Sequence, residues 1–384
     1  MTLRDIRSAK VKDKRVIIRV DMNVPFSARG RIADTFRIKE SLATIRWILS
    51  RGGKVFVLLH RSRPRGFERK YSIAPIAARA AGLLRQPVKI VRNPIKEDPH
   101  AYRNYAVLFC ENIRFFAGEE ANTASFSRAL ARWGELFVND AFAVSHRRSA
   151  SVVGLPKFLP SYGGLLLLRE VRALTAVFTR PRRPLLVILG GAKISTKIPY
   201  IAGLLKKADR VVLGGALLNT VLAAKRLEVG RSLIEPAMFR ESRKLLRQQK
   251  LFLPGDVVVT KGPQRAGKRR TVAVGRIEEK DYILDIGSRG SGAIQRLIKS
   301  ARTILWNGPL GNVDLPGGEG ATLILLRALL RARGNAVIGG GDLGALLKKI
   351  RTRSRRIYVS TGGGATLEFV ARGTLPGIEA LKKT

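Results

Sequence analysis

Short apolar runs recur along the whole chain, unbroken by polar residues, with amphipathic stretches between them. Unbroken runs are typical of parallel strands buried on both faces of a sheet. The expected strands are 16–20, 55–59, 106–110, 136–138, 185–189, 210–213, 303–306, 336–338 and 357–359, and the expected helices are 38–49, 73–84, 125–133, 198–206, 291–300, 321–332 and 344–350. This alternation predicts an α/β fold built on doubly wound parallel sheets.

The chain has 384 residues, more than one hydrophobic core of ordinary size holds. A glycine pair at 163–164 precedes a long apolar and basic helical pattern at 165–178, which stops before Pro181. We therefore expect a first domain at 1–162, a connecting helix at 163–180 and a second domain at 181–367. The tail at 368–384 is expected to pack back on the first domain.

The residues that follow the predicted strands differ between the two halves of the chain. In the first half they are polar or basic: Asp21, Asn23, His60, Arg63, Asn112, Arg114, His146 and Arg147, with Arg37 in the loop after Pro25. In the second half they are glycine clusters at 190–191, 214–215, 308–311, 339–341 and 362–364. Ligands of parallel sheets bind beyond the carboxyl ends of the strands. The pattern predicts a small anion held by guanidinium groups in the first half, and phosphate held by backbone N–H groups in the second.

Charged residues beside the glycine clusters leave two interpretations open. Lys193 and Lys197 are four residues apart at the expected start of a helix, so both could reach one phosphate, or they could be a solvated pair. Asp342 follows the cluster at 339–341, where it either caps a helix or binds the magnesium of a nucleotide.

The formal net charge of +44, from 72 Lys and Arg against 28 Asp and Glu, predicts a positive field over much of the surface. The basic residues are scattered and the aromatic residues sit mostly inside apolar runs, so non-specific polyanion binding is expected rather than dedicated nucleic-acid recognition. The N-terminal segment lacks the apolar core of a signal peptide, and no apolar stretch reaches the ~20 residues of a membrane span. We expect a cytoplasmic protein with no membrane partner.

Two features of the sequence could be mistaken for other functional sites, a partial phosphate-binding loop and a single cysteine. Gly262, Gly267 and Lys268 match the start of a P-loop, but Arg269 stands where Ser or Thr would bind magnesium and a strand-like segment, 271–274, follows. The only cysteine, Cys110, ends an apolar run, which favours a buried, unreactive thiol and excludes an intramolecular disulfide.

The glycines at 339, 341 and 344 match the G-x-G-x-x-G pattern between a strand and a helix, so a dinucleotide-binding oxidoreductase is an alternative. The next strand ends in Ser360 and Thr361 rather than in an acid for a ribose, which disfavours that alternative.

Taken together, nine stretches resemble the motifs of phosphoglycerate kinases. They are RVDMNVP at 19–25, DTFRI at 34–38, HRSRP at 60–64, ENIRF at 111–115, DAFAVSHR at 140–147, LGGAK at 189–193, WNGPLG at 306–311, GGGD at 339–342 and STGGGAT at 360–366. The resemblance implies two Rossmann-like domains joined by a helix. It also implies reversible phosphoryl transfer between 1,3-bisphosphoglycerate and ADP, giving 3-phosphoglycerate and ATP in glycolysis and gluconeogenesis.

The resemblance implies a role for each matching residue. It places phosphoglycerate on Asp21, Asn23, Arg37, His60, Arg63, Arg114 and Arg147, and nucleotide on Gly191, Ala192, Lys197, Gly215, Asn307, Pro309, Gly311, Asp314, Gly340 and Gly341. Asp342 would bind Mg²⁺ together with ATP or ADP, and Arg37, Lys193, Gly341 and Gly364 would face the transferring group. Such an enzyme is expected to be a monomer whose two sites close on each other by a hinge.

The chain departs from the family pattern at several positions. Asp314 stands in place of Glu, Leu343 of Thr or Ser, Arg61 and Ser62 of Leu and Gly, Ser149 of His, and Ala216 of a third glycine. The shorter reach of Asp314 is expected to weaken nucleotide binding. None of these changes removes the Arg and Lys set.

Overall fold

The computed structural model describes residues 3–262, 268–350 and 354–382. The chain divides into two compact units, one of residues 1–172 and 374–384 and the other of residues 173–373. Helix α5 (Leu165–Phe178) begins in the first unit and ends in the second. The domain boundaries expected at 162 and 180 stay a prediction.

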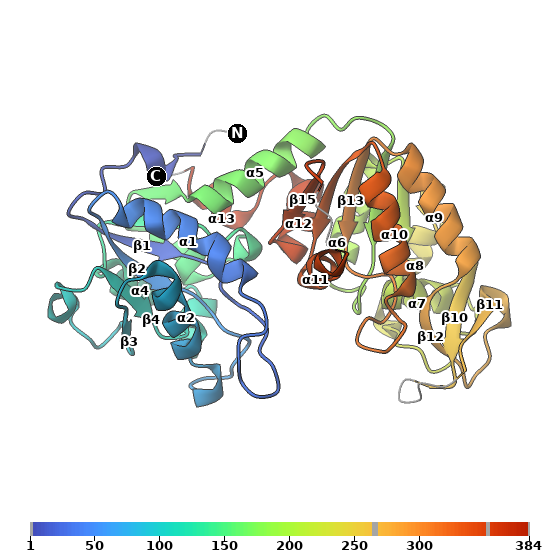
Figure 1. Ribbon diagram of the computed structural model, residues 1–384, viewed down its shortest axis with the longest axis horizontal. Helices are drawn as coiled ribbons and strands as arrows, with labels where there is room; N and C mark the ends of the chain where they lie inside the picture. The colour runs from blue at the N-terminus through green and yellow to red at the C-terminus, as the bar shows by residue number, and fades with distance from the viewer. Residues whose placement is uncertain (1–2, 263–267, 351–353, 383–384) are drawn as a thin grey trace. The chain divides into compact units, whose positions relative to one another are not determined.

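A six-stranded parallel sheet forms the centre of the first unit, in the order β3-β4-β2-β1-β5-β6 (Figure 1). The strands are β1 (Arg15–Arg19), β2 (Lys54–Leu58), β3 (Lys89–Val91), β4 (Val107–Cys110), β5 (Leu136–Asn139) and β6 (Ser161–Gly163). Four of them confirm the expected strands to within about a residue. Strands β3 and β6 were not expected, because they have only three residues each.

Helices cover this sheet because alternate strand residues point to opposite faces. Helix α1 (Phe36–Leu49) and helix α2 (Ala74–Leu84) bury Ile38, Leu42 and Ile76 in one cluster with Val16 and Val55 of the sheet, so both helices lie on the same face (Figure 1). The short helices α3 (Ala117–Glu120), α4 (Ala124–Ala131) and α13 (Pro376–Ala380) complete this unit.

The last described residues return to the first unit. Gly377 N donates a hydrogen bond to Ser145 O at 2.7 Å, and a Cβ at position 377 would lie 2.6 Å from the Cγ1 of Val152. Only glycine therefore fits where α13 meets this unit.

The second unit contains another six-stranded parallel sheet, in the order β15-β14-β13-β7-β8-β9. Its strands are β7 (Leu185–Leu189), β8 (Arg210–Leu213), β9 (Leu251–Phe252), β13 (Thr303–Asn307), β14 (Asn335–Gly339) and β15 (Ile357–Ser360). Its helices are α6 (Ile198–Lys207), α7 (Gly215–Ala224), α8 (Phe239–Leu246), α9 (Ser288–Ser300), α10 (Gly320–Arg331), α11 (Gly341–Lys349) and α12 (Gly363–Arg372). The doubly wound α/β architecture is confirmed in both units.

A small antiparallel sheet in the second unit was not expected. It has the order β11-β10-β12, from β10 (Asp256–Thr260), β11 (Arg270–Ala273) and β12 (Tyr282–Ile286). Strand β11, not a helix, follows the P-loop imitation, of which Gly267 lies outside the described residues. The sheet packs Val257 and Ile283 against Leu218 of α7.

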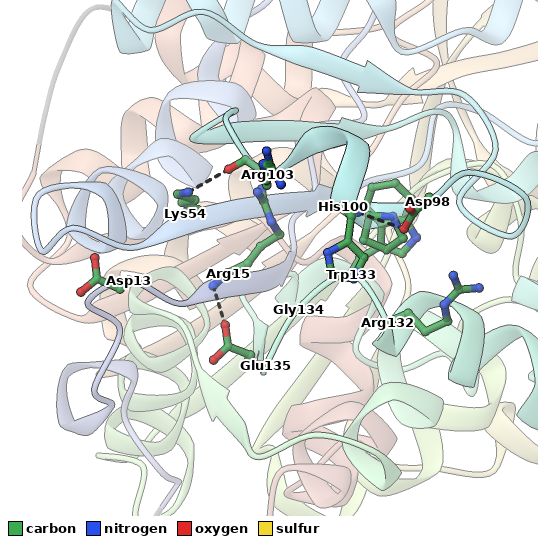
Figure 2. A pocket seen from close by; sticks show the side chains of 11 residues that line it. Asp13, Arg15, Lys54, Asp98, His100, Arg103, Arg132, Trp133, Gly134 and Glu135 are labelled. Atoms are coloured by element: carbon green, nitrogen blue, oxygen red, sulfur yellow. Dashed lines mark hydrogen bonds between the residues drawn. The ribbon is translucent and has the colours of Figure 1, made fainter.

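Each parallel sheet has a point where the chain order reverses, beside β1 in the first unit and beside β7 in the second. Such a point leaves a crevice at the carboxyl ends of the strands, where ligands bind. At the other end of the strands in the first sheet lies a cavity of about 470 Å³. It is lined by Arg15 and Lys54, at the amino ends of β1 and β2 (Figure 2). Among the described residues, no helix is long and apolar enough to cross a membrane.

Candidate active site

In the first unit, the loop after β1 holds a carboxylate against an arginine of α1. Asp21 is 5% exposed, and its Oδ2 accepts a hydrogen bond from Arg37 Nη1 at 2.5 Å. Its Oδ1 accepts from Asn23 N at 3.2 Å. Arg37 lies in the first turn of α1, so the loop and the helix together fix the direction of its guanidinium group.

The loop after β2 is tied to the same place by amide side chains. Asn23 Oδ1 accepts from Ser62 N at 3.0 Å, and Asn112 Oδ1 accepts from Arg61 N at 3.1 Å. Arg114 Nη1 donates to Ser62 O at 2.5 Å. Arg61 and Ser62 depart from the family pattern, but these bonds are made by their backbone groups and not by their side chains. Ser62 has φ +57°, a conformation that favours glycine.

Mutual electrostatic effects show that the predicted cations lie close together. Burial, together with the neighbouring charges of Arg147 and Arg19, lowers the pKa of Arg114 to about 10. Burial also lowers the pKa of His60 well below its usual 6.5, with added repulsion from Arg19, Arg114, Arg147 and Arg37. Cations held this close repel one another, so a polyvalent anion among them would relieve the repulsion.

Two further predicted residues lie around this cluster. Arg63 is exposed, and its charge also disfavours the cationic form of Arg114. The Nε of Arg147 is buried without a hydrogen-bond partner among the described residues. A buried donor left unpaired costs about 1–3 kcal/mol, and an anion oxygen would satisfy it.

In the second unit, the carboxyl ends of β7 and β13 meet through glycines. Gly190 N donates to Asn307 O at 2.9 Å, and a Cβ at position 190 would lie 1.8 Å from Pro309 O. Gly215 has φ +61°, and a Cβ there would lie 2.9 Å from both the N and the O of Gly191. These turns therefore require glycine for close packing of backbone on backbone.

The two lysines do not lie on one helix face, which corrects the expectation from their spacing. Helix α6 begins at Ile198, so Lys193 lies before the helix and Lys197 at its N-cap. Lys193 is exposed. The Nζ of Lys197 donates to Gly190 O, and burial lowers the pKa of Lys197 to about 8 while Asp342 opposes that shift. The turn from 190 to 197 therefore brings only Lys197 back to the strand ends.

A cavity of about 250 Å³ opens beside these turns. Of the predicted nucleotide residues, it is lined by Gly191, Ala192, Gly215, Pro309, Gly311, Asp314 and Asp342. Its other walls include Leu233, which is 50% exposed, together with Leu284 and Val313. An apolar wall with a carboxylate at Asp314 and another at Asp342 suits a base, a ribose and a metal-bound phosphate chain.

The starts of two helices carry glycines that the fold itself does not require. Gly341 and Gly364 are in the first turns of α11 and α12, and a Cβ at either position would meet no atom within 4 Å. Gly340, before α11, has φ +109°. Unpaired N–H groups at helix starts attract anions, and glycine lets a phosphate approach them closely.

Magnesium fits this region only as a nucleotide complex. Among the described residues, no group of three or more His, Cys, Asp or Glu side chains could hold a metal ion. Mg²⁺ is commonly bound by one or two carboxylates and by substrate phosphates, with water completing its shell. Asp342, which lines the cavity at the start of α11, supplies one such carboxylate.

Some residues of these sites were not singled out from the sequence. Arg19 is the last residue of β1 and is 2% exposed, yet its guanidinium lies beside His60. Asn219 and Leu233 line the nucleotide cavity from α7 and the loop after it. A charged residue inside a strand is the only sign that could have drawn attention to Arg19.

The chain has two α/β units, one with clustered cations and the other with glycine turns at strand ends. This arrangement is typical of phosphotransferases that use a small anionic acceptor and a nucleotide. The family model for phosphoglycerate kinase matches residues 6–372. A phosphoglycerate kinase of Thermus thermophilus is 40% identical over 390 residues, covering 99% of this chain and 100% of that protein. One of Thermomicrobium roseum is 39% identical over 389 residues, covering 99% of each.

Solved structures agree with the sequence relatives. The phosphoglycerate kinase of Pyrococcus horikoshii has a TM-score of 0.87 at 26% identity, covering 99% of this chain and 98% of that one. The enzyme of Coxiella burnetii has a TM-score of 0.81 at 32% identity, covering 100% and 99%. The chain belongs to the phosphoglycerate kinase family.

Proposed function

We infer that this chain catalyses the reaction of its family, the reversible transfer of a phosphoryl group between 1,3-bisphosphoglycerate and ADP to give 3-phosphoglycerate and ATP. The observation that carries the inference is the cation cluster around His60, where burial, together with repulsion from neighbouring guanidinium groups, depresses the pKa of that residue and of Arg114. A substrate with a carboxylate and a phosphate would neutralise such a cluster.

We assign the first-unit residues to 3-phosphoglycerate. The substrate-binding set is Asp21, Asn23, Arg37, His60, Arg63, Arg114 and Arg147. Asp21 is acceptor-only when ionised, so it suits the hydroxyl of the acid, while the arginines suit its two anionic ends. The contacts around Asp21 and Arg114 support this assignment.

We assign the second-unit residues to the nucleotide. The set is Gly191, Ala192, Lys197, Gly215, Asn307, Pro309, Gly311, Asp314, Gly340 and Gly341. Lys197 would pair with a phosphate oxygen, and the apolar wall of the cavity would take the base. Asp342 would bind Mg²⁺, which when present neutralises charge on the nucleotide phosphates.

The chemistry needs no strong general base, because the carboxylate of 3-phosphoglycerate and the phosphate of ADP are already ionised at neutral pH. Catalysis then consists of alignment and of charge stabilisation at the transferring group. We propose that Arg37, Lys193 and the helix starts at Gly341 and Gly364 supply that stabilisation. Hinge closure that excludes water from the acyl phosphate stays a prediction.

A coupled assay with ATP and 3-phosphoglycerate, run with and without Mg²⁺, tests this proposal. We expect turnover that requires both substrates and the metal. The matched variants are Arg114→Met, which removes a clustered cation, and Arg46→Met, which removes an exposed arginine of α1 that donates to Leu83 O. Only the first should raise the KM for 3-phosphoglycerate. A folded protein without turnover would overturn the proposal, and binding of NADH would favour the dinucleotide alternative.

The remaining partner assignments follow from charge and metabolism. With a net charge of +44, the chain should bind polyanions non-specifically, and such binding should fall steeply as salt rises, without sequence preference. We propose a monomer that acts in the cytoplasm, where its substrates are made. Size-exclusion chromatography with light scattering tests the oligomeric state.

A further inference from the structure

We propose that Arg19 is a positioning residue that holds His60 in the tautomer with its hydrogen on Nε2, through a buried chain that runs from Glu119 through Ser151 and Arg19 to His60. This chain of hydrogen bonds is itself given by the contacts in the structure. Only the contact of His60 with 3-phosphoglycerate rests on the proposed function.

Arg19 is a buried charge whose Nε, Nη1 and Nη2 each make one directional contact. Its Nε donates to Ser151 Oγ at 2.9 Å, its Nη1 donates to Val20 O at 2.5 Å, and its Nη2 lies 3.2 Å from His60 Nδ1. The residue is 2% exposed. Burying a guanidinium is costly unless its N–H groups are paired and its charge is compensated, so these contacts fix its position.

The negative charges that compensate Arg19 are those of Glu119, linked to it through Ser151, and of Asp21. The Oγ of Ser151 donates to Glu119 Oε1 at 2.6 Å, and Ser151 N donates to Glu119 Oε2 at 2.9 Å. A serine hydroxyl has a single hydrogen, which here goes to the carboxylate, so its oxygen is left to accept from Arg19. Every bond of the chain therefore has a defined direction.

The direction at the end of the chain decides the state of His60. A guanidinium group has donors only, so Nδ1 of His60 must accept from Arg19 and cannot carry a hydrogen. The neutral imidazole then has its hydrogen on Nε2. Burial and the charges of Arg19, Arg37, Arg114 and Arg147 keep the pKa of His60 well below its usual value, so the ring is neutral at pH 7.

This state gives His60 a particular task. Within the described part of the chain, Nε2 has no hydrogen-bond partner, so its N–H is available to a ligand oxygen. His60 would then contribute a neutral donor among cations, without adding another repelling charge. A group in this state cannot serve as a base through Nε2.

The first measurement is the tautomer of His60 in the wild-type protein without substrate. The chain has only three histidines, His60, His100 and His146, so long-range ¹H–¹⁵N spectra of the imidazoles are simple to assign with a His60→Gln variant. We expect a hydrogen-free Nδ1 and a hydrogen-bearing Nε2 at pH 7, with any titration of the ring lying below the usual 6.5. A hydrogen on Nδ1 would overturn the proposal.

Variants test whether Arg19 causes this state. In Arg19→Met the tautomer should become mixed and the pKa of His60 should rise towards its usual value. Arg19→Lys keeps a donor-only group and should preserve the tautomer. Ser151→Ala should leave the tautomer of His60 intact but increase exchange between the two tautomeric forms of the ring. The matched control is Arg15→Met in the same strand, since Arg15 donates to Tyr102 O and Tyr105 O. Arg15 lines the cavity at the amino ends of the strands (Figure 2), away from His60.

Kinetics complete the test. The KM for 3-phosphoglycerate should rise about tenfold in Arg19→Met, the size of one lost hydrogen bond, with the KM for ATP unchanged and partial rescue in Arg19→Lys. An unchanged His60 spectrum in Arg19→Met would overturn the positioning role. Absence of kinase activity in the wild type would instead contradict the proposed function and leave the tautomer result standing.

Discussion

The two regions that we propose as binding sites would recognise anions by different means. In the first unit, recognition would depend on side chains: cations around His60 and a carboxylate, Asp21, that is bonded to Arg37. In the second unit, it would depend mainly on the backbone, through glycine turns and helix starts at Gly341 and Gly364. Because of this difference, loss of a single charge should disable binding in the first unit, whereas gain of a single methyl group should disable binding in the second.

The largest effect should come from removing Arg37, the guanidinium of the first region that we propose faces the transferring group. Arg37→Ala should lower kcat by about 10³–10⁵-fold, the scale of a lost transition-state arginine, and remove the partner of Asp21 Oδ2. Steady-state kinetics would measure it, with Arg46→Ala on the same helix as the control. Turnover near the wild-type value would remove Arg37 from the catalytic role.

In the second region, the addition of a methyl group should separate function from stability. Gly341→Ala and Gly364→Ala meet no atom in the fold and should stabilise the protein by up to about 1 kcal/mol, because alanine favours helix. They should nevertheless lower kcat about tenfold or more, since a phosphate can no longer approach the backbone. Gly292→Ala, at a similarly open position inside α9, is the control for both measurements. Full activity in all three variants would contradict the backbone mode of binding.

Lys197, a half-buried lysine of the second region, should make nucleotide binding depend on pH. With a pKa of about 8, Lys197 is charged below pH 8 and neutral above it. The kcat/KM for ATP should therefore fall about tenfold per pH unit above 8, as expected for loss of one proton. Lys197→Arg, which stays protonated, should remove that limb from the profile. A flat profile up to pH 9.5 would show that phosphate contacts rest on the backbone alone.

The smallest effect concerns two buried carboxylates, one in each unit, that cap helices. Burial raises the pKa of Asp140 and of Asp285 from 3.8 to about 7. A raised pKa means stability that is complete below pH 4 and is lost as pH rises through 7. Asp140→Asn should therefore be more stable than the wild type by about 1–2 kcal/mol at pH 8, and the gain should vanish near pH 4.

Urea denaturation at the two pH values measures this difference, with Asp285→Asn as the counterpart in the second unit. Asp140 Oδ1 accepts from Leu166 N and Leu167 N at the start of α5, and an asparagine oxygen can still do so. A gain that does not depend on pH would point to packing rather than to charge.

The strands were predictable where both faces of a sheet are buried, as at β1, β7 and β13, because an unbroken apolar run leaves few alternatives. The antiparallel β10–β12 sheet was missed. Its strand β11 alternates exposed and half-buried residues, so the sequence indicated a strand at 271–274 but not the partners it pairs with. Helix α7 was missed because it begins at a glycine with positive φ and is apolar on most sides. Local sequence does not show that such a segment packs against the antiparallel sheet.

The site was predictable in its residues more than in its geometry. The motifs indicated Arg37, His60 and Arg114, but spacing alone wrongly placed Lys193 and Lys197 on a helix face. Arg19 was not found, because its importance comes from a contact with residue 60 and a link to Glu119, 100 positions later in the chain. Contacts this distant in sequence become visible only when the strands are assembled.

The buried Cys110 has a practical consequence for experiments. It is the only cysteine of the chain, it is 0% exposed, and burial raises the pKa of its thiol well above the usual value. Thiol-directed dyes and spin labels should therefore not react with Cys110 in the folded protein, because they react with exposed thiolates. Cysteines introduced on the surface, one in each unit, could then be labelled without first removing the native one, and the distance between the labels could be followed as each substrate is added.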